Sequence, residues 1–88
     1  MNADELARIT GTLVTAIAQA KTRAKKSGID PEFRKLVRHS REMHDLLLEA
    51  MMANEALQTE YLSGLSVTAE NAIEHLEALA EMPDGKMQ

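Results

Sequence analysis

Three histidines are the first residues of this sequence that could hold a metal ion or move a proton: His39, His44 and His75. None belongs to an H-E-x-x-H zinc motif, and none follows a Glu by three residues as in carboxylate-bridged di-iron bundles. His39 shares a helix face with Glu42, but one such pair does not complete a ligand set. We therefore expect no metal, with His44 as a half-buried core residue and His75 facing water.

The remaining residue combinations do not point to catalysis. The 88 residues include no Cys, which excludes thiol nucleophiles, disulfide scaffolds and Cys-based zinc sites. A Gly-rich phosphate loop, a G-x-S-x-G motif and a Ser, His and Asp set at a supporting spacing are also missing. Glu42, Asp45 and Glu49 share a helix face, which we interpret as a solvated acidic stripe. The sequence predicts a protein that is not an enzyme and that uses no cofactor.

Charge is distributed unevenly along the chain, although the formal net charge is only −4. Eight of the ten basic residues lie in 21–41 beside two acids, whereas 42–88 holds ten acids and one base. Cations early in the second expected helix oppose the helix dipole, which favours acids at that end. These cations leave two interpretations open, and in one they form an electrostatic docking patch for an acidic partner, with residues Arg34, Lys35, Arg38 and Arg41. The alternative is a solvated face whose cations pair with acids four residues later in the same helix, Arg38 with Glu42 and Arg41 with Asp45.

Apolar residues recur at helical spacing in three segments, which predicts an all-α fold. The first helix is expected at about residues 3–26, the second at about 31–63, and a shorter third at about 68–82. Gly28 ends the first helix, and no breaker interrupts the second before Gly64.

Short turns between these helices predict an antiparallel helical hairpin with a shorter third helix. Residues 1–82 form one helical domain in this interpretation, and residues 83–88 form a flexible C-terminal tail. No apolar run approaches the roughly 20 residues that a membrane helix needs. We therefore expect no membrane insertion and a cytoplasmic location.

The second expected helix carries an apolar stripe, here called the helix 2 seam, that follows a coiled-coil-like spacing from residue 33 to residue 61. Ser40 and Asn54 interrupt the seam, as polar residues that set register between the helices of oligomers often do. Only the first helix should cover its N-terminal part, so we predict that the seam binds another helical protein or a second copy. Its partner-binding residues are Phe33, Leu36, Met43, Leu47, Met51, Leu57 and Tyr61.

Residues 28–61 also carry a resemblance to a known family. The interhelical turn at 28–33 (GIDPEF), the segment 47–51 (LLEAM) with Glu55, and Tyr61 near the expected helix end resemble small helical-hairpin co-chaperones. These proteins, with a larger helical-repeat partner, keep the needle subunit of type III secretion systems monomeric in the cytoplasm. The resemblance implies a protein that binds the helices of another protein without catalysis, through the helix 2 seam.

Composition, patterning and resemblance together predict a non-enzymatic protein-binding adaptor, small chaperone or regulator that engages partner helices through the helix 2 seam. The alternative is a small nucleic-acid-associated regulator that uses the basic hairpin tip at residues 21–41. Nucleic acid is the less favoured partner because the acidic remainder of the chain should repel phosphate.

Overall fold

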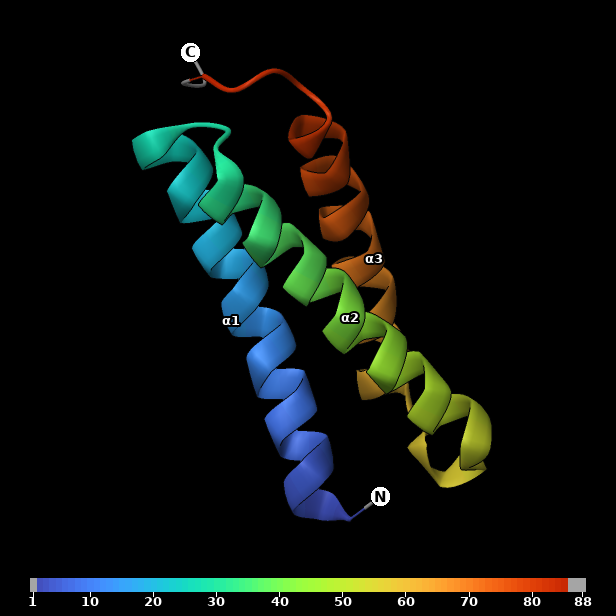
Figure 1. The fold of residues 1–88 in the computed structure, drawn as a ribbon. Helices are drawn as coiled ribbons and strands as arrows, with labels where there is room; N and C mark the ends of the chain where they lie inside the picture. Colours follow the sequence, from blue (N-terminus) through green and yellow to red (C-terminus); the bar gives the residue numbers. More distant parts are fainter. Residues whose placement is uncertain (1, 86–88) are drawn as a thin grey trace.

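Three helices form the fold in the computed structural model of the protein, which describes residues 2–85. They are α1 (Ala3–Ser27), α2 (Pro31–Ala53) and α3 (Glu60–Ala80), and the 3-10 turn η1 (Glu55–Leu57) joins the last two. α2 runs antiparallel to both other helices, and the bundle is elongated, with extents of 43 × 20 × 16 Å (Figure 1). The predicted all-α antiparallel hairpin with a shorter third helix is confirmed, because α3 has 21 residues against 25 and 23.

Local signals explain where α1 begins and how the turn between α1 and α2 forms. The side chain of Asn2 accepts from the backbone N–H three residues later at 2.8 Å and caps α1. α1 ends before Gly28, whose φ of 82° costs glycine little and would strain other residues. Asp30 caps α2 by accepting from the N–H of Phe33 at 2.8 Å, and Pro31 takes the first helical position. The first helix and the start of the second therefore lie where the sequence placed them.

The boundary between the second and third helices lies earlier than predicted. α2 ends at Ala53 and not near residue 63, and α3 begins at Glu60 and not near residue 68. Gly64, which we expected to stop the second helix, lies inside α3. A glycine in a helix interior costs about 1 kcal/mol, which tertiary packing readily offsets.

Three polar side chains produce this earlier turn. Asn54 accepts from the N–H of Ala56 at 3.0 Å, and Thr59 caps α3 by accepting from the N–H of the residue three positions on at 3.1 Å. Between them, the Gln58 side chain donates to the carbonyl of Met51 at 2.9 Å and satisfies one of the free carbonyls at the end of α2. The turn needs no glycine or proline because these side chains supply its hydrogen bonds.

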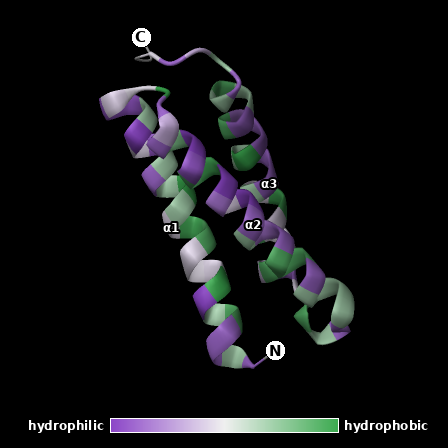
Figure 2. Cartoon of the chain, viewed as in Figure 1, coloured by the Kyte–Doolittle hydropathy of each residue, from purple (hydrophilic) through white to green (hydrophobic). Residues whose placement is uncertain are grey.

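The inward row of α2 packs into two hydrophobic clusters that include residues of all three helices. Near the α1–α2 turn, Phe33 and Val37 share a cluster with buried alanines of α1 and with Leu76 of α3. Toward the opposite end, Leu47 and Met51 share a cluster with apolar residues of both α1 and α3. In Figure 2, which colours the ribbon by residue hydropathy, hydrophilic residues predominate in the upper half of α2.

The chain after α3 returns to the α1–α2 turn. Ile29 and Gly85 form an antiparallel bridge, in which each residue donates its N–H to the carbonyl of the other. The flexible tail expected at 83–88 stays a prediction, since residues 83–85 lie against this turn and 86–88 are outside the described residues.

Substituting Leu47 by Ala should destabilise the protein by roughly 2–5 kcal/mol, because its side chain is 0% exposed and its loss leaves a cavity. The neighbouring Leu46 is 41% exposed, so Leu46→Ala should change stability by less than about 0.5 kcal/mol. Urea unfolding followed by circular dichroism measures both values. Equal losses for the two variants would contradict the position of α3 on α2.

Candidate functional site

The structure corrects the predicted partner face, because much of the helix 2 seam lies inside the protein. Phe33 and Leu47 are 0% exposed, and Met51 is 9% exposed. In the folded chain these three side chains cannot contact a partner. The physical reason is the early turn at Asn54, which lays α3 along the stripe that a longer second helix would have left open.

The remaining seam residues are accessible to different degrees. Leu36, Met43 and Leu57 are half-buried and pack against the core clusters. Tyr61 is 75% exposed and does not belong to either cluster. Among the seven predicted partner-binding residues, Tyr61 is therefore the most accessible to a partner.

Among the exposed large apolar residues that the sequence did not predict as partner contacts, two lie near the C-terminal end of α2. Met52 is 83% exposed and Leu48 is 36% exposed, one helical turn apart on α2. The signal for them was present, since residues 46–53 are apolar nearly all round the helix. That pattern is ambiguous, because a helix covered on two sides and a helix with an exposed apolar face produce it equally.

Of the four predicted docking residues, Arg34 is engaged at the end of α3. Its guanidinium donates to the carbonyls of Ala80 at 3.0 Å and Met82 at 2.9 Å, and it forms an ion pair with Asp84. A cation at this position satisfies free carbonyls of the helix and complements its dipole. Arg34 therefore serves the contact between α2 and α3.

Arg41 is engaged in the middle of the same contact. It donates to the two carboxylate oxygens of Glu77 at 3.0 and 2.8 Å and also pairs with Glu70. The hydrogen bonds from Arg41 lower the pKa of Glu77 and those carboxylates raise the pKa of Arg41, in each case against partial burial. The pairing of Arg41 with Asp45 within α2 does not occur.

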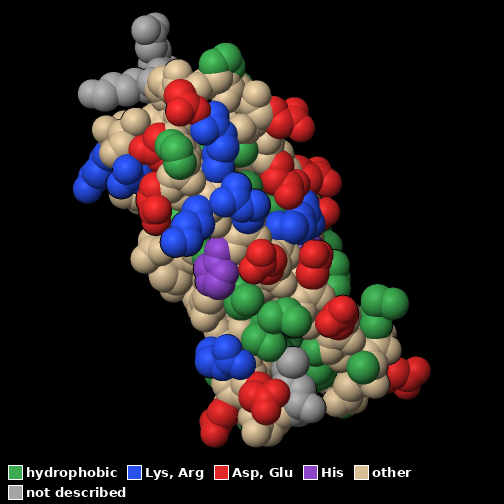
Figure 3. All heavy atoms as spheres, viewed as in Figure 1, with side chains coloured by type: hydrophobic (Ala, Val, Ile, Leu, Met, Phe, Trp, Pro, Cys, Tyr) green, Lys and Arg blue, Asp and Glu red, His purple; other side chains and the backbone are tan. Residues whose placement is uncertain are grey.

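Lys35 and Arg38 are the predicted docking residues that stay exposed and form no ion pair within residues 2–85. Figure 3 shows Lys and Arg side chains gathered over the upper half of the molecule, at the end where α1 and α2 are joined. The exposed basic residues of this end that form no ion pair in the described part of the chain are Lys21, Lys25, Lys26, Lys35 and Arg38.

His44 is buried between α2 and α3, deeper than the half-buried position expected for it, at 1% exposure. Its Nε2 lies 3.0 Å from both the carbonyl and the hydroxyl of Ser66. A carbonyl only accepts, so Nε2 carries the proton and donates. Nδ1 has no hydrogen-bond partner and lies 3.5 Å from Oε2 of Glu70. This histidine helps to hold α3 in place, while His39 and His75 are exposed.

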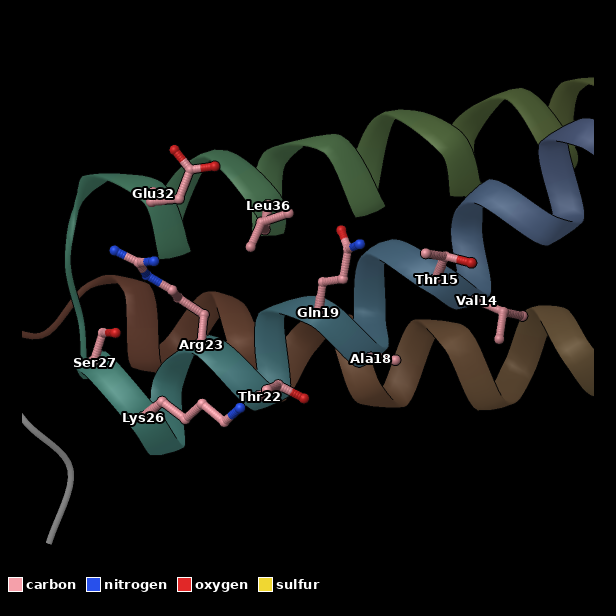
Figure 4. A pocket seen from close by; sticks show the side chains of 10 residues that line it. All are labelled: Val14, Thr15, Ala18, Gln19, Thr22, Arg23, Lys26, Ser27, Glu32 and Leu36. Atoms are coloured by element: carbon pink, nitrogen blue, oxygen red, sulfur yellow. The ribbon is translucent and has the colours of Figure 1, made fainter.

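A hollow of about 590 Å³ lies beside α1 and the start of α2 (Figure 4). Gln19 and Arg23 of α1 and Leu36 of α2 point toward it, and its lining includes a single carboxylate, Glu32, and no histidine. Across residues 2–85, moreover, no three His, Cys, Asp or Glu side chains are grouped as metal ligands would be.

Lowering the pH below about 4.5 should weaken the contact between α2 and α3 through protonation of Glu77. The pKa of Glu77 in the folded chain is below its ordinary value of 4.5, so its stabilising effect is present above that value and is lost as the pH falls through the lowered pKa. Thermal unfolding of wild type and Glu77→Gln between pH 7 and pH 3 measures the effect. The variant should lose less stability than wild type over this range.

Glu74→Gln is the matched control, since Glu74 is exposed on α3 and forms no ion pair in the described part of the chain. It should keep the pH dependence of the wild type. If Glu74→Gln and Glu77→Gln flatten the profile equally, the ion pair with Arg41 is not the cause.

None of the helices within residues 2–85 has the length and apolar content that crossing a membrane requires. No protein-family model matches the sequence, and neither a curated protein nor a solved structure matches the chain. The function therefore has to be argued from the surfaces described above.

Proposed function

We propose that the chain is a non-enzymatic protein-binding module, an adaptor or small chaperone of the cytoplasm, that binds a helix of its partner where α2 passes into α3. The observation that carries this proposal is the exposure of large apolar side chains there: Met52 at 83%, Tyr61 at 75% and Leu48 at 36%. We refer to these three residues as the apolar end. Exposed apolar side chains that gather at one place are typical of interaction surfaces.

The residue types at the apolar end suit a helical partner. Methionine is unbranched and polarisable, and it adapts to partner side chains of different shapes. Tyrosine provides a large contact area together with a hydroxyl that can stay hydrated at the rim. Figure 3 shows hydrophobic side chains gathered over the lower half of the molecule. They lie away from the basic end, by which we mean the end where α1 and α2 are joined and where Lys21, Lys25, Lys26, Lys35 and Arg38 are exposed.

The charges around the apolar end favour a basic partner. Glu49, Glu55 and Glu60 are exposed and form no ion pair within the described residues. The sequence holds no Lys or Arg from residue 42 to residue 85. An amphipathic helix with apolar anchors and basic flanks is complementary to such a surface in both hydrophobicity and charge.

The resemblance to needle-subunit co-chaperones supports the same class of function, since those proteins bind helices of other proteins without catalysis. The short connection between Ser27, where α1 ends, and Pro31, where α2 begins, is compatible with such a helical hairpin. The resemblance also implies binding through the helix 2 seam, and α3 occupies most of that surface here. A secretion co-chaperone of this structure would therefore have to bind its partner through the apolar end, or else through the helix 2 seam after α3 has been displaced.

The variant Met52→Asp/Tyr61→Asp should abolish partner binding while leaving the fold unchanged, because both side chains are exposed. The tagged protein is used to capture proteins from the source cells, and each captured protein is then tested as a purified chain by isothermal titration calorimetry. We expect at least a tenfold loss of affinity for the double variant, since about 1.4 kcal/mol of lost apolar contact corresponds to a factor of ten.

Val14→Asp is the matched control, because Val14 is 50% exposed but lies in the middle of α1. It should bind like the wild type. Equal losses for both variants would contradict the proposed location of the surface. Capture of nucleic acid that is released at high salt would instead favour the basic end, because phosphate contacts weaken steeply with salt.

A further inference from the structure

The side of α2 opposite its buried row carries two blocks of opposite charge. Lys35 and Arg38 come first along the helix, and Glu42, Asp45 and Glu49 follow at steps of three or four residues. All five side chains are exposed, and none forms an ion pair within residues 2–85. We call these five residues the outer face of α2. Even Arg38 and Glu42, at the spacing of an intrahelical pair, stay apart.

The order of these blocks opposes the dipole of α2. A helix is stabilised by acids near its N-terminus and by bases near its C-terminus. α1 follows this rule, with acids in its first turn and lysines in its last. α2 has one acid in its first turn, Glu32, and places Lys35 and Arg38 beyond that turn. It has no base in its last turn, where Glu49 comes close. The two blocks are not neutralised by each other within α2, and an antiparallel helix laid on the outer face would neutralise both.

We propose that the outer face of α2 binds the same face of a second copy of the chain, in an antiparallel pair about a two-fold axis near residue 40. In this register Lys35 of each copy faces Asp45 of the second copy, and Arg38 faces Glu42. Because a two-fold axis relates the two copies, each of these two ion pairs forms twice in the dimer. The two α2 dipoles also run in opposite directions. A parallel arrangement would instead set each charged block against its own kind.

The shape of the outer face fits a second helix. One hollow of about 320 Å³ is lined by Lys35, Arg38, His39 and Glu42. A second hollow of about 570 Å³ lies between α2 and α3 and shares Arg38 and Glu42 with the first. The outer face is therefore hollowed between its own side chains and bordered by a groove on the α3 side, and a second helix can pack its side chains into such relief.

The pair should be weak and sensitive to salt. Its contacts are exposed ion pairs, which ions screen strongly, with Leu46 as an apolar side chain at the border. This inference goes beyond the proposed function, because the facing pairs of the dimer use residues 35–45 of α2 and do not need the apolar end, although Glu49 lies at the border of both surfaces.

Sedimentation equilibrium of the full chain over a concentration series tests the proposal. The wild type should form a dimer at about 20 mM salt, and its dissociation constant should rise at least about tenfold at 500 mM salt. Lys35→Glu/Arg38→Glu and Glu42→Lys/Asp45→Lys should each be monomeric at low salt. An equimolar mixture of these two variants should form a 1:1 heterodimer, because every facing pair is then again of opposite charge.

Lys21→Glu/Lys25→Glu is the matched control, since it changes the net charge as much as Lys35→Glu/Arg38→Glu but lies on α1. It should dimerise like the wild type. A wild type that stays monomeric at low salt, a dimer that survives the charge reversals on α2, or a mixture that stays monomeric would each overturn the proposal. Circular dichroism confirms that every variant is folded.

Discussion

The fold depends on one constraint: the inward row of α2 has to pack against two helices at once. Phe33, His44 and Leu47 lie in this row and are almost fully buried, which a two-helix hairpin alone would not achieve. The chain is rich in alanine and contains no Cys, so its stability comes from close helix packing without a covalent staple. The third helix is therefore part of the core, and the short connection at residues 54–59 is what brings it back.

Polar contacts determine how α3 lies on that row. Arg34 holds the C-terminal end of α3 and Arg41 holds its middle, while His44 donates to the carbonyl of Ser66 nearer its start. Apolar packing alone tolerates sliding of one helix along another, whereas these directional contacts at three levels favour a single register. The uneven charge distribution of the sequence thus partly serves the fold, because two arginines of the basic segment bind the acidic third helix.

The sequence allowed the helices to be predicted, but not where the second one ends. Periodicity and the Gly28, Asp30 and Pro31 signals have local causes, so they can be read without knowing tertiary contacts. The turn after Asn54 depends on side-chain hydrogen bonds of Asn54, Gln58 and Thr59. Asn and Thr favour helix caps, but without a neighbouring Gly or Pro they mark a boundary less clearly than Gly28 and Pro31 do. The partner of Arg41 was also beyond local inference: Asp45 is near in sequence, and Glu77 is near only after α3 has folded back. The burial of Phe33, Leu47 and Met51 could not be predicted locally either, since α3 covers part of the predicted partner face only because of that turn.

Dimerisation through the outer face of α2 would determine where the two copies of the apolar end lie. In an antiparallel pair about an axis near residue 40, the C-terminal ends of the two α2 helices point in opposite directions. Each copy then presents its apolar end, with Met52 and Tyr61, at one extreme of the dimer. A dimer of this kind is bivalent, and it binds two linked or repeated partner helices far more tightly than a monomer does, because the second contact becomes intramolecular. Salt would then weaken partner binding in two ways, by dissociating the dimer and by screening the charges around the apolar end, while the apolar contact itself stays intact.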